Sequence, residues 1–105
     1  MFPNPLCDQT VTVYRYFGGT VQRYVADGCY YGYSDSLEED GRQRQFLLML
    51  PKEIPLAPGD RVLSGVGPEK VDWETFLPHA YPGLSQVRQA RAFYWEGRFS
   101  HWEAE

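Results

Sequence analysis

Turn-forming dipeptides divide this chain into short segments, and they limit its fold more than any other feature of the sequence. Gly18-Gly19, Asp27-Gly28, Pro58-Gly59 and Glu96-Gly97 each favour a sharp reversal, because glycine adopts the left-handed backbone conformations that tight turns need. The longest uninterrupted apolar run covers residues 46–50 and ends at a proline. The pattern therefore favours short strands joined by turns over long helices.

The segments between these turns have the composition of β-strands. Residues 10–16 and 20–26, on either side of Gly18-Gly19, predict a hairpin. A third strand is expected after a turn at Asp27-Gly28. A polar loop is expected over 34–41. Residues 43–50 predict a strand that is buried on both faces or has its outer face covered, with a short helix as the alternative. A short strand over 61–64 and a hairpin made by 86–95 and 98–102 complete the prediction. The expected fold is all-β, a small antiparallel β-barrel or sandwich of six to seven short strands.

At 105 residues the chain has the size of one domain. Residues 1–9 contain Pro3 and Pro5, which favour an extended backbone, so they are expected to form an N-terminal arm before a single β-domain over 10–105. Residues 65–85 are rich in proline and glycine and predict a loop, with at most a short helical turn near 72–77. Within that turn, Trp73, Phe76 and Leu77 are expected to cap one end of the barrel.

Aromatic residues are unusually frequent, with eight Tyr, six Phe and three Trp. Such large side chains fit pleated, half-buried surfaces. In the last hairpin, each cross-strand aromatic pair is expected to stabilise the fold by about 0.2–1 kcal/mol. We therefore interpret the aromatic residues mainly as packing elements. The residues expected to form the structural core are Val11, Val13, Phe46, Leu48, Leu50, Val62, Trp73, Phe93, Trp95 and Trp102.

The sequence contains no recognisable catalytic group, so no enzymatic activity, cofactor or metal site is expected. Cys7, Cys29, His79 and His101 are isolated in the sequence, whereas structural zinc sites use closely spaced ligand pairs. Nothing local would activate either thiol as a nucleophile, and both cysteines are expected as free thiols. The acidic run over 38–40 is expected to be solvated. A glycine-rich phosphate loop, a dinucleotide fingerprint and a serine-nucleophile elbow are all missing.

A formal net charge of −4 argues against a protein that binds by neutralising phosphates. No apolar stretch approaches the length of about 20 residues that spans a bilayer, and no signal peptide is recognisable, so a cytosolic protein without a membrane partner is expected. A tyrosine-rich face could still stack nucleic-acid bases or sugar rings. That leaves open a small binding module for single-stranded nucleic acid or carbohydrate. The candidate interaction residues on this face are Tyr30, Tyr31 and Tyr33. In the N-terminal arm, Phe2, Pro3 and Pro5 are candidates for contact with a neighbouring molecule.

Four pieces of sequence occur in a distinctive order. They are VTVYRY at 11–16, QFLLMLP at 45–51, PGDRVLSG at 58–65 and HWEA at 101–104. In this order the chain resembles the small head-tail connector proteins, also called minor capsid, head-closure or stopper-like proteins, of tailed phages and prophages of Gram-positive bacteria. The HWEA ending is the most distinctive piece.

The resemblance implies a non-enzymatic structural subunit with a small β-barrel fold. Such a subunit would assemble into a ring in the virion neck and dock the portal or adaptor to the tail. Its expected partners are other copies of itself, portal and adaptor proteins and tail-completion proteins, with double-stranded DNA only as passing cargo. Its expected location is the cytoplasm of the bacterial host during assembly and then the neck. The adaptor, stopper and tail-completion layers of the neck all remain open.

Overall fold

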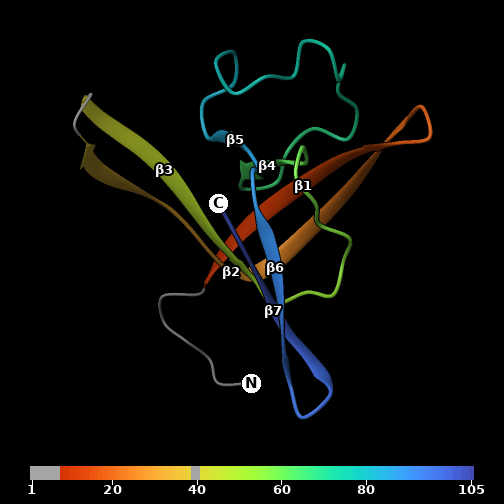
Figure 1. Cartoon of the computed structure of the whole chain (residues 1–105). Helices are drawn as coiled ribbons and strands as arrows, with labels where there is room; N and C mark the ends of the chain where they lie inside the picture. The colour runs from red at the N-terminus through yellow and green to blue at the C-terminus, as the bar shows by residue number, and fades with distance from the viewer. Residues whose placement is uncertain (1–7, 39–40) are drawn as a thin grey trace.

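The computed structural model describes residues 8–38 and 41–105, and it describes side chains outside residues 33–45. The described residues form no helix, and so none that could cross a membrane. Seven antiparallel strands form one strongly curled sheet, a half-barrel (Figure 1), which confirms the all-β prediction. The strands are β1 (Gln9–Phe17), β2 (Thr20–Glu38), β3 (Gly41–Leu50), β4 (Arg61–Ser64), β5 (Leu84–Gln86), β6 (Ala90–Trp95) and β7 (Arg98–Ala104).

The strands follow the order β5-β4-β1-β2-β3-β7-β6 across the sheet. β1 and β2 form the predicted hairpin, in which Phe17 pairs with Thr20. Gly18 and Gly19 have φ values of 63° and 82°, as a two-residue hairpin turn with positive φ at both central positions requires. This hairpin therefore forms where the local sequence placed it.

β2 does not reverse at Asp27-Gly28, where a turn was predicted. Asp27 and Gly28 together lie opposite the single residue Thr10 of β1, which makes a β-bulge. Gly28 has a φ of 70°, and Thr10 Oγ1 donates to Asp27 Oδ1 at 2.6 Å. The positive φ bends the strand without ending it. β2 consequently joins two halves of the sheet, pairing with β1 through residues 20–29 and with β3 through residues 30–38.

The loop predicted over 34–41 is also wrong for most of its length. β2 continues to Glu38, β3 begins at Gly41, and these two residues pair with each other; residues 39–40 lie outside the described residues. The two strands project from the sheet as a ribbon (Figure 1). The polar composition of this stretch predicted a loop, because it does not reveal the pairing of β2 with β3.

β3 has one buried face, although burial on both faces was predicted. Phe46, Leu48 and Leu50 are buried, whereas Leu47 is 40% exposed. β1 is the strand buried on both faces, since residues 11–14 are buried in succession. The chain between β4 and β5 covers the second face of β1. The sequence of β1 alone does not reveal this cover.

The main core lies inside the curl of the sheet and draws on strands from both halves. Burying one large aliphatic or aromatic side chain of this kind stabilises a fold by about 1.5–3 kcal/mol. Trp102 packs against this core, and its Nε1 donates to Ile54 O at 2.8 Å. Six of the residues expected in the core lie there, namely Val11, Val13, Phe46, Leu48, Leu50 and Val62.

A second, smaller core lies on the other face of the sheet. Tyr14, Phe76 and Leu84 are its buried members, and Trp73 packs against it half-buried. Phe76 N donates to Asp72 O at 2.9 Å, so the expected helical turn is a single hydrogen-bonded turn. Phe76 meets the ring of Tyr14 edge to face at 4.7 Å. The aromatic residues of this turn therefore cover a face of β1, and they do not cap the end of a barrel.

Residues 65–83, which we call the strap, are held on this face by polar side chains from the sheet. Each side chain donates to a strap carbonyl, and the bonds are partly buried except the one to Phe76 O, which is buried. They give partners to backbone oxygens that the fold shields from water. The bonds run from Thr12 Oγ1 to Gly65 O (2.8 Å), Arg23 Nη2 to Gly67 O (2.7 Å), Tyr14 Oη to Pro68 O (2.7 Å), and Arg61 Nη1 to Trp73 O (2.5 Å) and Phe76 O (2.6 Å).

The segment predicted as one strand over 86–95 is two strands at opposite ends of the sheet. β5 ends at Gln86, and Val87 continues its pairing by donating to Asp60 O at 2.7 Å. Gln89 and Glu105 then exchange two backbone hydrogen bonds of 2.9 and 3.0 Å. The three residues between β5 and β6 thus connect the two ends of the curled sheet and partly close the barrel.

Asp60 is buried next to the Pro58-Gly59 turn, which forms as predicted. Asp60 N donates to Ala57 O at 3.1 Å, and Ala57 N donates to Asp60 Oδ2 at 2.9 Å. Burial raises the pKa of the Asp60 carboxyl above its ordinary value of 3.8, against the smaller opposing effects of the Ala57 N–H and of Arg15. The folded protein therefore favours the protonated form of Asp60 more than the unfolded chain does.

The stability of an Asp60→Asn variant should depend on pH differently from that of the wild type. With the folded pKa raised, the contribution of Asp60 to the free energy of unfolding is fully present below the unfolded pKa and is lost as the pH rises through the folded pKa. The neutral variant should therefore gain stability relative to the wild type as the pH rises from below 3.8 through the raised pKa of the folded state. Urea titrations across this range measure the difference, and a constant difference would contradict the expectation.

Candidate interaction surface

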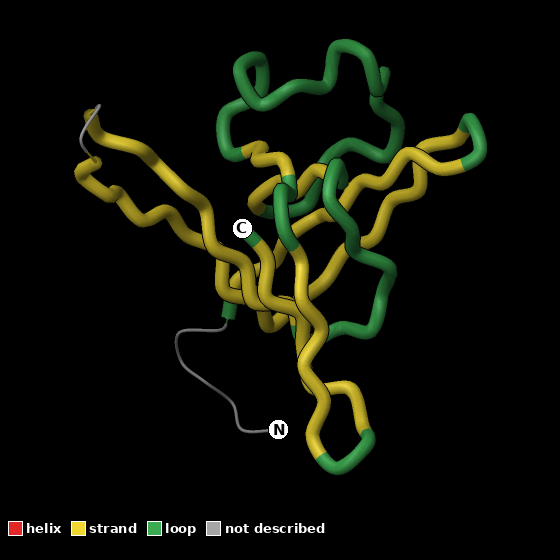
Figure 2. Tube along the Cα trace, viewed as in Figure 1, coloured by secondary structure: helices red, strands yellow, loops and turns green. Residues whose placement is uncertain are grey.

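The β6–β7 hairpin projects from the body of the protein (Figures 1 and 2). Its end carries exposed aromatic residues. Its two-residue turn has φ values of 50° at Glu96 and 78° at Gly97. Tyr94 is 63% exposed and Trp95 is 75% exposed. The placement of Trp95 in the core is therefore wrong, because the hairpin carries this residue beyond the sheet that covers the core.

Aromatic contacts between the two strands hold this hairpin together below its tip. Phe93 and His101 stack at 5.0 Å with nearly parallel rings, and Tyr94 meets Phe99 edge to face at 6.0 Å. Phe99 also lies 6.2 Å from the ring of Trp102. Phe93, expected in the core, is half-buried in this stack. The cross-strand aromatic pairs are present as expected, but they stabilise a projecting hairpin.

A bulge in β7 brings three polar residues into one hydrogen-bonded chain. Phe93 pairs with His101 and Tyr94 with Phe99, which leaves Ser100 as the extra residue. Ser100 Oγ lies 2.9 Å from His101 Nδ1, and His101 Nε2 lies 2.9 Å from Glu103 Oε2. These hydrogen bonds fix the imidazole ring against Phe93, and we interpret them as contacts that stabilise the hairpin.

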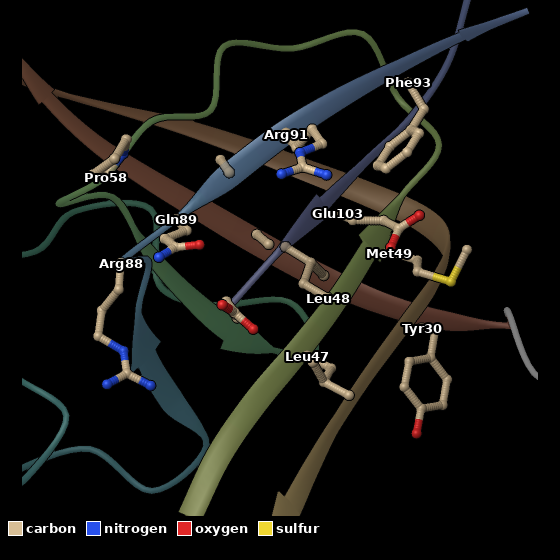
Figure 3. Close-up of a pocket in the computed structure, with 13 residues that line it drawn as sticks. Tyr30, Leu47, Leu48, Met49, Pro58, Arg88, Gln89, Arg91, Phe93 and Glu103 are labelled. Atoms are coloured by element: carbon tan, nitrogen blue, oxygen red, sulfur yellow. The ribbon is translucent and has the colours of Figure 1, made fainter.

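An open hollow of about 620 Å³ lies at the base of this hairpin (Figure 3). Part of its floor is a row of residues paired across four neighbouring strands: Tyr30 with Met49, Met49 with Glu103, and Glu103 with Arg91. Leu47 and Phe93 also line it, and Arg88 lies at its end in Figure 3. Because Leu47 and Met49 alternate with the core residues of β3, this row belongs to the face turned away from the main core.

The hollow combines an apolar floor with charges of both signs. Arg88 and Arg91 contribute positive charge, and Glu103 and Glu105 contribute negative charge. A polyanion bound here would be repelled by the two carboxylates in the lining. A protein surface with apolar residues and charges of both signs could match both the apolar floor and the charges. Aromatic residues, Met and Arg are also the types enriched in protein–protein interfaces. The composition of the hollow therefore resembles that of protein–protein interfaces more than that of a site for a polyanion.

The tyrosines predicted to form one interaction face do not share a face. Tyr30 lines the hollow, whereas Tyr31 is buried in the main core, where its Oη lies 2.9 Å from Gly83 O and 2.7 Å from Ser85 Oγ. Successive residues of a strand point to opposite faces, which is why the pair is divided. The prediction of a tyrosine-rich binding face is therefore wrong for Tyr31. The side chain of Tyr33 and the residues Phe2, Pro3 and Pro5 lie outside the described part of the structure.

The candidate metal ligands lie in different parts of the fold. Cys29 is buried in the main core with its Sγ 3.5 Å from Ala26 O, His79 is exposed in the strap, and His101 is on β7. Cys7 lies outside the described residues. Among the side chains that the structure describes, no three His, Cys, Asp or Glu are grouped to hold a metal ion. The free thiols and the lack of enzymatic activity remain predictions.

Sequence reasoning missed most of the residues that line the hollow. Leu47 and Met49 were assigned to a strand buried on both faces, and Arg91 and Glu103 were given no role. Strand alternation could have identified Leu47 and Met49 as residues of the second face. Their register with Glu103 and Arg91 depends on β3 pairing with β7, which are far apart in the sequence.

No protein-family model, no curated protein and no solved structure matches this chain.

Proposed function

We propose that this chain is a non-enzymatic structural subunit of the head-tail connector of a tailed phage or prophage. In this role it assembles with copies of itself into a ring and docks the portal or adaptor to the tail. The observation that carries the proposal is the projecting β6–β7 hairpin, whose tip exposes Tyr94 and Trp95. The motif order that resembles connector proteins gives the assembly its biological setting.

The hairpin tip and the hollow at its base are suited to assembly into a ring. Identical subunits close a ring through heterologous contacts, in which one patch of each copy meets a different patch of the next. The tip with Trp95 and the hollow with Tyr30 and Met49 are two such patches on one molecule. Trp and Tyr are also the residues that most often dominate binding energy at interfaces.

The negative net charge of the protein is compatible with a position in the neck, around passing DNA. A net charge of −4 gives little attraction to phosphates, so DNA could pass a ring of such subunits as cargo without binding to it. Assembly would take place in the cytoplasm of the bacterial host, and the finished subunit would remain in the virion neck. Its partners would be portal or adaptor proteins on one side and tail-completion proteins on the other.

Electron microscopy of the purified protein, alone and mixed with the portal protein of the same phage or prophage, tests the proposal. Rings, or added density on the portal, are expected. A protein that stays monomeric and leaves the portal unchanged would contradict a role in the connector.

A Trp95→Ser variant should weaken this assembly at least tenfold, since interface tryptophans often contribute about 2 kcal/mol or more to binding. The fold should be unaffected, because the side chain is 75% exposed. Val66→Ser is the matched control, since Val66 is 71% exposed in the strap and is expected to leave assembly unchanged. Sedimentation velocity measures both variants, and equal assembly of the two would exclude the tip from the interface.

A further inference from the structure

The tip of the β6–β7 hairpin, which we define as residues 94–98, carries an exposed aromatic ring next to charges of both signs. Trp95 is 75% exposed, and Glu96 and Arg98 lie on either side of Gly97, exposed as well. Among the side chains that the structure describes, neither of these two charged groups has a partner in an ion pair or a hydrogen bond. The tip therefore presents a large apolar ring and two charges that are available to another molecule.

The hollow at the base of the hairpin offers the complementary groups. Its lining includes apolar atoms of Tyr30, Leu47 and Met49, and Leu47 is 40% exposed. Arg88 and Arg91 line the same hollow and are exposed. A volume of about 620 Å³ falls within the range of sites that take drug-sized molecules, so the hollow has room for an indole ring.

The two arginines of the hollow have no carboxylate partner among the described side chains. Arg91 lies opposite Glu103 in the β6–β7 ladder, and cross-strand neighbours of opposite charge attract each other. The Glu103 carboxylate, however, lies 2.9 Å from His101 Nε2. Positive charge next to the apolar floor is therefore available to a carboxylate from another subunit.

We propose that the hairpin tip of one copy binds in the hollow of a second copy. Trp95 covers the apolar floor, and Glu96, the next residue along the chain, lies against Arg88 and Arg91. Residues that dominate binding energy at interfaces are often Trp and Arg, and they lie in pockets from which water is excluded. Opposite charges on the two sides then fix the orientation of the copies.

A second copy is required because the tip cannot reach the hollow of its own subunit. Trp95 lies five residues beyond Ala90 on β6, about 17 Å along the strand at 3.4 Å per residue. β6 stays paired with β7 as far as Trp95 and Arg98, so the tip cannot fold back without breaking the ladder. One molecule thus carries two complementary surfaces that do not meet within it, as a heterologous contact between identical subunits requires.

The inference deepens the proposed function by naming the side chains that meet between copies, and it rests on that proposal only in requiring copies of this chain to associate. Charge reversal in the full-length chain tests it. Glu96→Arg should weaken self-association at least tenfold, because it brings like charges together in the contact. Arg88→Glu and Arg91→Glu should each weaken it by a similar factor. Sedimentation velocity at one fixed ionic strength measures all of these variants.

Combining the changes on the two sides should restore the contact. With Glu96→Arg and Arg88→Glu in one chain, opposite charges meet again, and self-association should return to within threefold of the wild type. Glu96→Arg with Arg91→Glu is the second combination, and the first keeps the test decisive if a glutamate opposite Glu103 disturbs the ladder. The matched control joins Glu74→Arg to Arg88→Glu. Glu74 is exposed in the strap, so this pair has the same net charge and should stay weakened.

Photo-crosslinking identifies the residues in contact. A benzophenone amino acid in place of Trp95 keeps an aromatic ring at the tip, and its crosslinks in linked dimers should map to Tyr30, Leu47 or Met49. The control places the same amino acid at Phe17, which is 64% exposed beside the turn of the β1–β2 hairpin. Its crosslinks to these three residues should be at least tenfold fewer.

The inference is overturned if neither combined variant regains self-association, if the Glu74 control regains it equally, or if the crosslinks from position 95 miss the hollow. Rings that form unchanged with Glu96→Arg, or subunits that bind the portal without touching each other, would also overturn it and leave the proposed function in place. Copies that join through this contact but stop at a dimer, with each tip in the other's hollow, and leave the portal unchanged would contradict the proposed function alone.

Discussion

Replacing Arg61 by methionine should lower the free energy of unfolding by about 3–5 kcal/mol, because it removes two of the hydrogen bonds that hold the strap on the sheet. Arg61 Nη1 donates to Trp73 O at 2.5 Å and to Phe76 O at 2.6 Å. Leaving a buried acceptor without its partner costs about 1–3 kcal/mol. The guanidinium also lies 3.7 Å from the ring centre of Trp73, a contact that contributes about 0.5–2 kcal/mol.

Methionine is the informative replacement because its length preserves most of the packing while removing every donor. Arg61 is 8% exposed, and burial lowers the pKa of its guanidinium from the ordinary value. Its Nε has no partner among the described residues, so the arginine already carries part of the cost of burial. The expected loss therefore reflects the two carbonyls and the Trp73 ring more than the charge itself.

Urea denaturation measures the Arg61→Met effect, and Arg98→Met serves as control. Arg98 is exposed at the hairpin tip, and surface substitutions of this kind usually change stability by less than about 0.5 kcal/mol. Arg61→Lys keeps the charge without the planar fork and should fall between the two. If Arg61→Met were no less stable than Arg98→Met, the strap would not depend on this arginine.

The parts of the fold that could be predicted from sequence are those fixed by local chemistry. Gly18-Gly19 and Glu96-Gly97 each join two strands that are adjacent in the chain, so the hairpin follows from the turn. Asp27-Gly28 has the same local chemistry but forms a bulge, because β1 pairs with residues on both sides of it. Composition alone does not distinguish a glycine that reverses a strand from one that bends it.

Features that depend on contacts distant in the sequence could not be predicted. β1 is buried on both faces because the strap, more than fifty residues later, lies across it. The short strand β5 is defined by its pairing with β4, and its three residues carry too little pattern to be recognised. The candidate site shows the same limit, since Trp95 has the composition of a core residue and is exposed only because its hairpin projects.

Gly67→Ala should lower the free energy of unfolding by about 2–3 kcal/mol, the range expected when an added methylene overpacks a filled core. A Cβ at this position would overlap Tyr14 Oη and lie 2.7 Å from Leu63 Cδ2. Gly67 cannot easily move away, since its N–H donates to Thr12 Oγ1 at 2.8 Å and its carbonyl accepts from Arg23. Thermal or urea unfolding measures the loss.

A double-mutant cycle with Tyr14→Phe separates this overlap from other causes. Tyr14→Phe alone removes the hydrogen bond from Oη to Pro68 O and should cost about 1–2 kcal/mol. In the double variant the atom that the new methyl group overlaps is absent, so the combined loss should be smaller than the sum of the two single losses by at least about 1 kcal/mol. Val66→Ala, at the adjacent exposed position, should be close to neutral. Strict additivity in the cycle would show that Tyr14 does not limit the space at Gly67.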